Sequence, residues 1–285
     1  MTDAGWRPYD GLIDLALAED VGAGDVTTAA TIPPGARASG VMLAKSPGVV
    51  SGLEVAAAVF RRVDPAVRFT RMVADGDRVA DRQPLASVEG PAAALLIGER
   101  TALNLVQRLS GVATLTARFV EAVEGTGARI VDTRKTTPGM RWLEKAAVRH
   151  GGGGNHRYNL ADGVLIKDNH LAAVGGPDRI ARAIRLARER VPHGLKIEVE
   201  VTTLGELDEA LAAGADIVLL DNMDVPTIAE AVQRTAGRAL LEASGGVTLD
   251  TVRAIAETGV DLISVGALTH SAGSLDISLE FAIAP

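Results

Sequence analysis

The sequence of 285 residues contains no cysteine and few aromatic residues, which make up 3% of the chain. Without cysteine there can be no disulfide, no thiolate nucleophile and no cysteine-ligated zinc site. Ala, Val and Leu must therefore fill most of the core, within an apolar fraction of 47%. A chain of this length and apolar content can form one large α/β domain or a barrel with a smaller companion domain.

Long apolar runs are also missing. No stretch approaches the roughly 18 consecutive apolar residues that a membrane helix requires. The first ten residues, MTDAGWRPYD, have neither the basic head nor the apolar core of a secretory signal. We therefore expect a soluble, cytoplasmic protein that does not bind membranes.

Positive charge is scarce overall but concentrated in one window. The chain has a net charge of −7, whereas residues 134–167 contain seven Lys or Arg against two acidic residues. A small basic island in an acidic chain is typical of a site for a small polyanion, and nucleic acid would need a broader basic face. A solvated charged helix followed by a flexible loop is the alternative interpretation.

From about residue 129 onward, short apolar runs alternate with helical patterns. The runs predict strands at 129–132, 163–167, 195–201, 216–221, 239–243 and 261–266, and the patterns between them predict helices at 138–148, 177–191, 204–213, 226–235 and 249–258. Strands that alternate with helices form parallel βαβ units. Six strands are fewer than the eight of a closed barrel, so an incomplete barrel and an open doubly wound sheet both fit this pattern.

Nearly every predicted strand of this half ends in charged, hydroxyl or glycine residues. They are 132–135, 167–170, Glu198 and Glu200, Asp221 and Asn222, Glu242 with 244–246, and Gly266 with Ala267. The carboxyl ends of parallel strands converge on one edge of a sheet or barrel. This repetition predicts a functional site at that edge.

The first 112 residues have a different pattern. It predicts a helix at 12–18, strands at 38–43 and 67–73, a tight turn at 75–77 and a longer helix at 91–109. We expect an α+β domain with antiparallel strands. The DGDRV hairpin is similar to half of a lipoyl or biotinyl carrier domain, but the other half is not visible and Lys45 lacks a hairpin-tip context.

Three glycine-containing segments are candidates for a role in the site. Glycines 151–154 are no nucleotide P-loop, since no Gly-Lys-Ser/Thr follows them. They are either a flexible connection or a close backbone approach that brings residues 155–157 to the strand ends. The turns at 244–246 and 265–270 could seat a phosphate on backbone N–H groups, or could bind nothing.

The cations of the basic window differ in what they recognise best. Arg134 and Arg157 suit bidentate recognition of carboxylates, whereas Lys135 and Lys167 are better point charges for phosphates. Each of them could instead be an ordinary surface cation.

Two carboxylates and a histidine accompany these cations. Glu200 and Asp221 would hold Mg²⁺ or ribose hydroxyls in a phosphate-rich site, or would be salt-bridge partners of the cations. His156 follows the glycine run directly, which favours a binding role over that of a core histidine.

Eight segments, in order along the chain, resemble one enzyme family. They are EDVGAGDVTT (19–28), ERTALNLVQRLSGVAT (99–114), DTRKTTPGMRWLEKAAVRHGGGGNHRYNL (132–160), LIKDNH (165–170), EVEV (198–201), LLDN (219–222), EASGGV (242–247) and VGALTH (265–270). The family is that of the quinolinate phosphoribosyltransferases, or carboxylating nicotinate-nucleotide pyrophosphorylases. The resemblance covers the chain from about residue 12 to its end, and the central segment is its most specific part.

The resemblance implies an α/β fold with an N-terminal α+β sandwich domain (1–112) and an incomplete α/β barrel (113–285) whose tail, 271–285, packs back on the first domain. It also implies a pentosyl transfer. The ring nitrogen of quinolinate attacks C1 of phosphoribosyl pyrophosphate (PRPP), pyrophosphate leaves, and the 2-carboxylate is lost as CO₂. The product is nicotinate mononucleotide, on the de novo route to NAD.

The resemblance further implies the roles of the site residues. The dicarboxylate would be clamped by Thr133, Arg134, His156 and Arg157, together with Arg100 from a neighbouring subunit. Pyrophosphate would be bound by Lys135, Lys167 and His170. Ribose and Mg²⁺ would be bound by Glu200 and Asp221, partly through water, and the 5-phosphate by Ser244, Gly245, Gly246, Val265, Gly266, Ala267 and His270. The assembly would be a homo-oligomer, either a dimer or a hexamer of dimers.

Three other functions fit parts of the sequence. A related phosphoribosyltransferase could act on another base, as the molybdenum-transport-associated paralogues of this family would. A sugar-phosphate barrel lyase could use Lys167 as a Schiff-base nucleophile, but DTRKTTPG has no role in that chemistry. A non-catalytic binding protein would not need Glu200 and Asp221 opposite a cationic cluster.

Overall fold

The computed structural model of the chain describes residues 7–283 and contains two compact units. Unit 1 comprises Met1–Ala117, Thr136–Gly152 and Leu268–Pro285, and unit 2 comprises Arg118–Lys135 and Gly153–Ala267. Most of the segment considered above for a secretory signal lies outside the described residues. The domain boundaries 1–112 and 113–285 stay a prediction.

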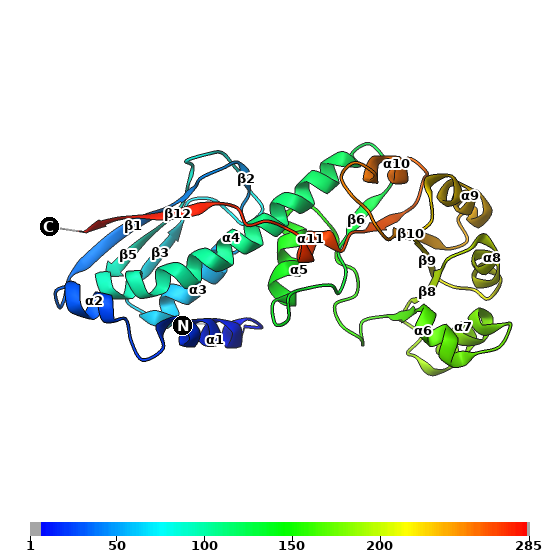
Figure 1. The fold of residues 1–285 in the computed structure, drawn as a ribbon, viewed down its shortest axis with the longest axis horizontal. Helices are drawn as coiled ribbons and strands as arrows, with labels where there is room; N and C mark the ends of the chain where they lie inside the picture. The colour runs from blue at the N-terminus through cyan, green and yellow to red at the C-terminus, as the bar shows by residue number, and fades with distance from the viewer. Residues whose placement is uncertain (1–6, 284–285) are drawn as a thin grey trace. The chain divides into compact units, whose positions relative to one another are not determined.

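Unit 1 is built on a four-stranded antiparallel sheet in the order β12-β1-β5-β3. Its strands are β1 (Arg37–Ala44), β3 (Arg68–Arg71), β5 (Pro84–Pro91) and β12 (Ile277–Ile283). β12 pairs antiparallel with β1 from Ala44↔Ile277 to Ala38↔Ile283, so the C-terminal strand completes a sheet that begins near the N-terminus (Figure 1). The predicted α+β character of this part of the chain is confirmed.

Several further elements belong to unit 1. They are α1 (Asp10–Val21), α2 (Val26–Thr31), α3 (Leu53–Val63), the small β2–β4 pair (Gly48–Val49 and Arg78–Val79), α5 (Arg141–His150) and most of α4 (Ala92–Ala122) and α11 (Ala267–His270). α4 extends well beyond the helix predicted at 91–109, because buried residues such as Val112 and Thr116 continue the helical pattern.

Unit 2 contains a six-stranded parallel sheet in the order β6-β11-β10-β9-β8-β7. Its strands are β6 (Arg129–Val131), β7 (Val164–Ile166), β8 (Ile197–Val201), β9 (Ile217–Asp221), β10 (Leu240–Ser244) and β11 (Leu262–Ser264). All six lie where the sequence predicts strands. Among the described residues β6 and β7 each have one neighbour in this sheet, so the sheet does not close, and the predicted incomplete α/β barrel is confirmed.

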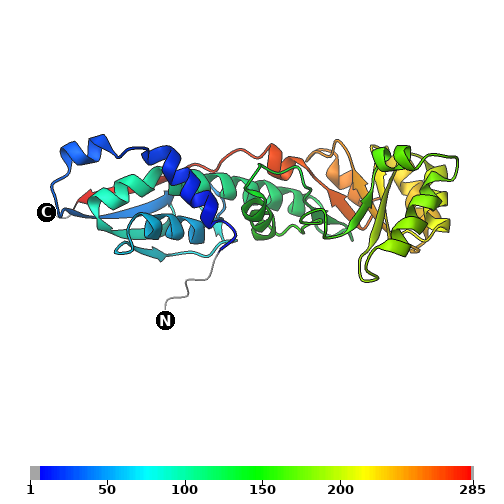
Figure 2. The ribbon, with the colours of Figure 1, turned by 90° about the horizontal axis from the view of Figure 1, so that it is seen from below.

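The helices of unit 2 lie along one face of this sheet (Figures 1 and 2). They are α6 (Asp168–Val174), α7 (Arg179–Arg190), α8 (Leu204–Ala212), α9 (Val225–Thr235) and α10 (Val252–Ala256). Side-chain hydrogen bonds fix two of their starts: Thr203 caps α8 and Asp224 caps α9, each accepting from a backbone N–H of the first turn. No described helix of either unit is both long and apolar enough to span a bilayer.

The alternation along β8 decides which residues reach the site. Ile197, Val199 and Val201 are fully buried on one face, whereas Glu198 and Glu200 lie on the other. Because successive side chains of a strand point to opposite faces, the helix-covered face is apolar and the remaining face carries carboxylates.

Candidate active site

The predicted strand-end residues of unit 2 lie at the carboxyl ends of its parallel strands. Thr133, Arg134 and Lys135 follow β6, Lys167 follows β7, Glu200 lies in β8, Asp221 ends β9, Ser244 ends β10, and Val265 to Ala267 follow β11. The parallel register of β8, β9 and β10 therefore places their polar residues along one edge.

The glycine run makes a close backbone approach to β6. Gly154 forms an isolated parallel bridge with Val131, and its N–H donates to the carbonyl of Ile130 at 2.8 Å. A Cβ on Gly154 would lie 3.2 Å from the Val131 side chain. These contacts support close approach over a plain flexible connection as the role of the run.

Asp132 fixes the segment that follows the glycines. This carboxylate is fully buried and accepts from the His156 backbone N–H at 2.9 Å and from the Asn155 side chain at 2.7 Å. Both oxygens are thus used inside the protein, and residues 155–157 are held at the end of β6.

His156 lies against two buried carboxylates to which the sequence gave no individual role. Its Nε2 is 3.1 Å from Glu198 Oε2 and 3.5 Å from Glu242 Oε2, and its Nδ1 accepts from the Arg157 backbone N–H at 2.8 Å. Both ring nitrogens are therefore engaged by groups of the chain itself. Direct contact between His156 and a substrate stays a prediction.

The buried charges of this cluster perturb one another. Burial lowers the pKa of the Arg157 guanidinium, and the charge of Arg134 lowers it further, while Glu198 acts in the opposite direction. Burial raises the pKa of Glu242 to about 7, with a further contribution from the charge of Glu198. Two neighbouring cations beside buried carboxylates, with perturbed pKa values at Arg157 and Glu242, are typical of a functional site.

Lys167 and Glu200 form an ion pair at the ends of the neighbouring strands β7 and β8. Lys167 is also the N-cap of α6, and its backbone N–H donates to Nδ1 of His170 at 2.9 Å. The resemblance places Lys167 and His170 on pyrophosphate and Glu200 on ribose and Mg²⁺, and the ion pair of Glu200 with Lys167 matches the alternative interpretation of Glu200 as a salt-bridge partner. The Nζ of Lys167 is therefore engaged by a carboxylate of the chain itself.

The turn that follows β10 is hydrogen-bonded to Asn222, which follows β9. The Asn222 backbone N–H donates to Ser244 O at 2.9 Å, and the Asn222 side chain donates to Asp221 at 2.8 Å. Gly245 has φ +98°, and a Cβ there would lie 2.2 Å from the Asn222 side-chain oxygen. Only glycine fits this position without displacing Asn222.

The structure differs from expectation in the two turns predicted to bind phosphate. The helix predicted at 249–258 is only the five-residue α10, which begins at Val252. The Val265 N–H donates to Val131 O at 2.9 Å within the sheet. Backbone N–H groups of residues 244–246, and of Gly266 and Ala267 at the start of the four-residue α11, remain the predicted phosphate donors.

Two predicted site residues, Arg100 and His270, belong to unit 1. Arg100 on α4 is exposed and lies 3.7 Å from Glu99. His270 Nδ1 is 2.6 Å from the Ser271 hydroxyl. Their roles stay predictions.

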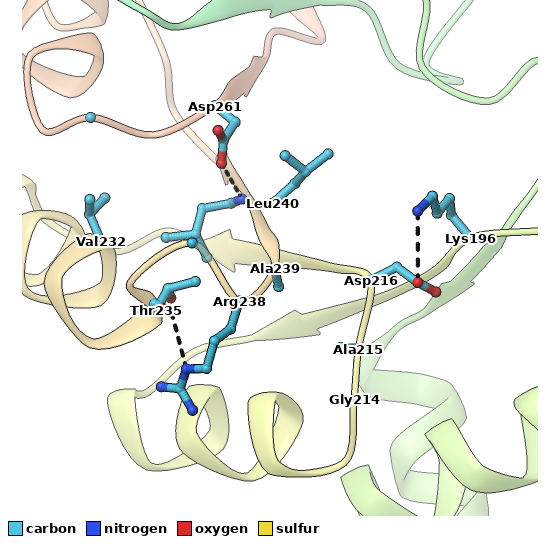
Figure 3. A pocket seen from close by; sticks show the side chains of 13 residues that line it. Lys196, Gly214, Ala215, Asp216, Val232, Thr235, Arg238, Ala239, Leu240 and Asp261 are labelled. Carbon is cyan, nitrogen blue, oxygen red and sulfur yellow. Dashed lines mark hydrogen bonds and ion pairs between the residues drawn. The ribbon is translucent and has the colours of Figure 1, made fainter.

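A pocket of about 580 Å³ lies at the opposite, amino ends of the unit 2 strands (Figure 3). Asp216 and Asp261 line it, and each accepts a backbone N–H of a neighbouring strand at 2.8 Å. Lys196 lies 3.9 Å from Asp216. The two aspartates of this pocket thus stabilise the sheet, and residues at the amino-terminal face of such folds usually contribute to stability rather than to catalysis.

Four of the polar strand-end residues received no individual role from the sequence: Asp132, Glu198, Asn222 and Glu242. The signal available for the two glutamates was a charged residue in the middle of an apolar strand, IEVEV or LLEAS. Asp132 and Asn222 were visible as polar strand ends, but their hydrogen-bond partners lie far away in the sequence.

Family models and solved structures match the whole of this architecture. A model described as the N-terminal domain of quinolinate phosphoribosyl transferase matches residues 25–110, and one described as its C-terminal domain matches residues 112–280. The chain is 49% identical over 274 residues to the nicotinate-nucleotide pyrophosphorylase (carboxylating) of Mycobacterium leprae, covering 94% of this chain and 95% of that protein.

Two other relatives extend the likeness. The probable nicotinate-nucleotide pyrophosphorylase (carboxylating) of Bacillus subtilis is 44% identical over 269 residues, covering 94% of this chain and 92% of its own. The crystal structure of NadC from Streptococcus pyogenes superimposes with a TM-score of 0.92 at 41% identity, over 99% of this chain and 100% of that chain.

Proposed function

The chain belongs to the quinolinate phosphoribosyltransferase family, and from this we infer the function of the site at the carboxyl ends of the unit 2 strands. The protein transfers the phosphoribosyl group of PRPP to quinolinate with decarboxylation, in the biosynthesis of NAD. The ring nitrogen attacks C1 of PRPP as pyrophosphate leaves. CO₂ then leaves, its bonding electron pair stays at C2 beside the quaternised nitrogen, and C2 takes up a proton from water. The observation that carries the site assignment is the group of cations and carboxylates at the carboxyl ends of the unit 2 strands.

We propose that Arg134 and Arg157 bind the two adjacent carboxylates of quinolinate. The charge of Arg134 lowers the pKa of Arg157, so the two guanidiniums repel each other before substrate arrives. A dianion relieves that repulsion, and each guanidinium can donate two parallel hydrogen bonds to a carboxylate. Thr133 and the neighbour's Arg100 would complete the clamp, and His156 would join it only by releasing a bond that its ring now makes.

The phosphates of PRPP would meet the lysines and the glycine turn. Lys167 is partly exposed and paired with Glu200, so an arriving pyrophosphate would compete with that carboxylate for the ammonium. Lys135 and His170 would add charge on the pyrophosphate side, and residues 244–246, 266–267 and 270 would seat the 5-phosphate.

Glu200 and Asp221 have a donor set that fits Mg²⁺. Both carboxylates are half-buried at the ends of adjacent strands. Mg²⁺ is usually bound by one or two carboxylates, with its other positions left to water and phosphate. The ion would neutralise charge on the departing pyrophosphate. The two carboxylates would also favour positive charge developing on the ribose ring.

We also propose that the protein is a cytoplasmic homo-oligomer. We place Arg100 in the active site of a neighbouring subunit, in a homodimer or a hexamer of dimers. Its contact with Glu99 is long and exposed, and such pairs hold a side chain only weakly. A cytoplasmic location fits substrates that carry several negative charges and cannot enter a bilayer unaided.

One assay tests this function. Purified protein is incubated with PRPP, Mg²⁺ and quinolinate labelled in its 2-carboxylate, and nicotinate mononucleotide and CO₂ are measured. Equal amounts of the two products are expected. Absence of the nucleotide, or nucleotide without CO₂, contradicts the function, whereas full turnover in EDTA contradicts only the role given to Mg²⁺.

A further inference from the structure

The buried cluster of His156, Glu198 and Glu242 has no role in the function proposed so far beyond the suggested contact of His156. The ligand-type atoms of the three residues lie within 4.8 Å of one another. Glu198 is 4% exposed and Glu242 is 1% exposed. Charged residues are seldom buried to this degree without a specific reason.

Hydrogen bonds define the protonation of the histidine. The Arg157 backbone N–H can only donate, so the His156 Nδ1 that receives it at 2.8 Å carries a lone pair. In the neutral ring the proton therefore lies on Nε2, which faces Glu198 Oε2 at 3.1 Å. The ring thus links the Arg157 backbone to the carboxylate of Glu198.

A metal ion is the obvious alternative occupant of this cluster, because one imidazole and two carboxylates suit Zn²⁺ or Mn²⁺. Binding a metal through Nε2 would move the proton to Nδ1. That proton would then face the N–H of Arg157 across 2.8 Å. The hydrogen bonding disfavours the metal and favours a cluster that works through its protons.

The charge of Glu198 also acts on the arginines. It raises the pKa of Arg157, opposing both burial and the charge of Arg134. Glu198 therefore compensates part of the repulsion between two guanidiniums that the proposed function uses for the dicarboxylate.

Glu242 lies close to Glu198 in the buried cluster. It comes from β10, which is separated from β8 by β9, and it is hydrogen-bonded to Ser264 of β11. Glu198 Oε1 and Glu242 Oε2 have no hydrogen-bond partner among the described residues. Two carboxylates this close cannot both be ionised at low cost, and the charge of Glu198 accordingly raises the pKa of Glu242.

We propose that Glu198 is a positioning residue for quinolinate. Glu198 fixes the Nε2–H tautomer of His156 and thereby holds Arg157 beside Arg134, and Glu242 lies next to Glu198 in the same buried cluster. The inference rests on the proposed function for its substrate. Glu198 does not touch the dicarboxylate in this account; it acts through the imidazole and through its charge.

The first test is spectroscopic and needs no turnover. Protein with ¹⁵N-labelled histidine contains five such rings, and comparison with His156→Gln assigns the one of interest. The wild type should show a protonated Nε2 and a bare Nδ1 for His156 at neutral pH. A proton on Nδ1, or on both nitrogens, would overturn the inference while leaving the proposed function intact.

The second test separates positioning from general damage. Glu198→Ala removes the oxygen that accepts from His156 Nε2–H, so it should raise the KM for quinolinate roughly 10- to 100-fold, the usual effect of losing a group that orients a binding residue. The KM for PRPP should change less than about twofold. Glu230→Ala, at an exposed position on α9, is the matched control and should change neither KM. Equal rises in both KM values, or no rise for quinolinate, would overturn the proposal.

A third measurement addresses the metal. Wild type and Glu242→Gln are each titrated with Zn²⁺ or Mn²⁺ alone, and the two proteins should bind the ion equally or not at all. Stoichiometric binding by the wild type that is lost in Glu242→Gln would show a metal site here and contradict the positioning role. An inactive wild type would contradict the proposed function instead, and the histidine spectrum would still report on the tautomer.

Discussion

Glu242 shows how far a single residue of this site departs from ordinary behaviour. Its pKa is raised from 4.5 to about 7, first by burial and then by the charge of Glu198. Between these two values the folded protein keeps a proton that the unfolded chain has lost. The stability contributed through this group is therefore highest below about pH 4.5, falls as the pH rises to about 7, and is constant above that.

Glu242→Gln removes this titration without changing the shape of the side chain. The stability of the variant relative to the wild type should increase between about pH 5 and pH 7, by up to about 3 kcal/mol, since one pKa unit corresponds to about 1.4 kcal/mol. Urea denaturation at several pH values measures it, with Glu230→Gln as control. A difference that does not vary with pH would contradict the raised pKa.

Lys135 and Lys167 are expected to serve catalysis rather than stability. Replacing either by Ala should lower activity roughly 10²- to 10³-fold, or about 3–4 kcal/mol, because the charge facing pyrophosphate is lost. The melting temperature should change little, because Lys135 is exposed and Lys167 is partly exposed, and ion pairs of such lysines contribute only about 0–1 kcal/mol.

Lys196→Ala is the matched control, because Lys196 is an exposed lysine of the same unit at the amino ends of the strands. Its activity should stay normal. Near-normal activity with a large loss of stability in Lys135→Ala or Lys167→Ala would make those lysines structural.

At the scale of elements, local patterns explain what could be predicted. The six strands of unit 2 were predictable because each is an apolar run with a polar end. The pairing of β12 with β1 was not visible in any local pattern, because it joins segments more than 200 residues apart; only the family resemblance implied that the tail returns to the first domain. The same limit applies to the site: Lys167 and Glu200 stood out as strand ends, whereas the contact of Glu198 with Glu242 depends on the order of the strands in the sheet.

The turn between β10 and α10 gives a prediction at this scale. Gly245 and Gly246 both have a positive φ. A Cβ at Gly245 would clash with the Asn222 side chain, whereas a Cβ at Gly246 would have no atom within 4 Å. Gly245→Ala should therefore raise the KM for PRPP roughly tenfold more than Gly246→Ala does, with the KM for quinolinate unchanged. Equal KM values for PRPP in the two variants would show that the contact with Asn222 does not shape the phosphate site.

At the scale of the whole molecule, the proposal is that two subunits build each active site. Arg100→Ala and Lys167→Ala should each be nearly inactive alone. Random mixing makes about half of the dimers hybrid, and one site of each hybrid is then intact, so recovery of about a quarter of wild-type activity is expected. Proven subunit exchange without recovery would mean that each subunit completes its own site.

The most direct measurement of the central claim compares quinolinate with nicotinate as acceptors of the phosphoribosyl group. Nicotinate has one carboxylate, so it would leave Arg134 or Arg157 unpaired in a partly buried site, and an unpaired buried charge is strongly unfavourable. We predict that kcat/KM for quinolinate exceeds that for nicotinate by roughly 10² or more. Comparable values for the two acids would contradict recognition of a dicarboxylate by this pair of arginines.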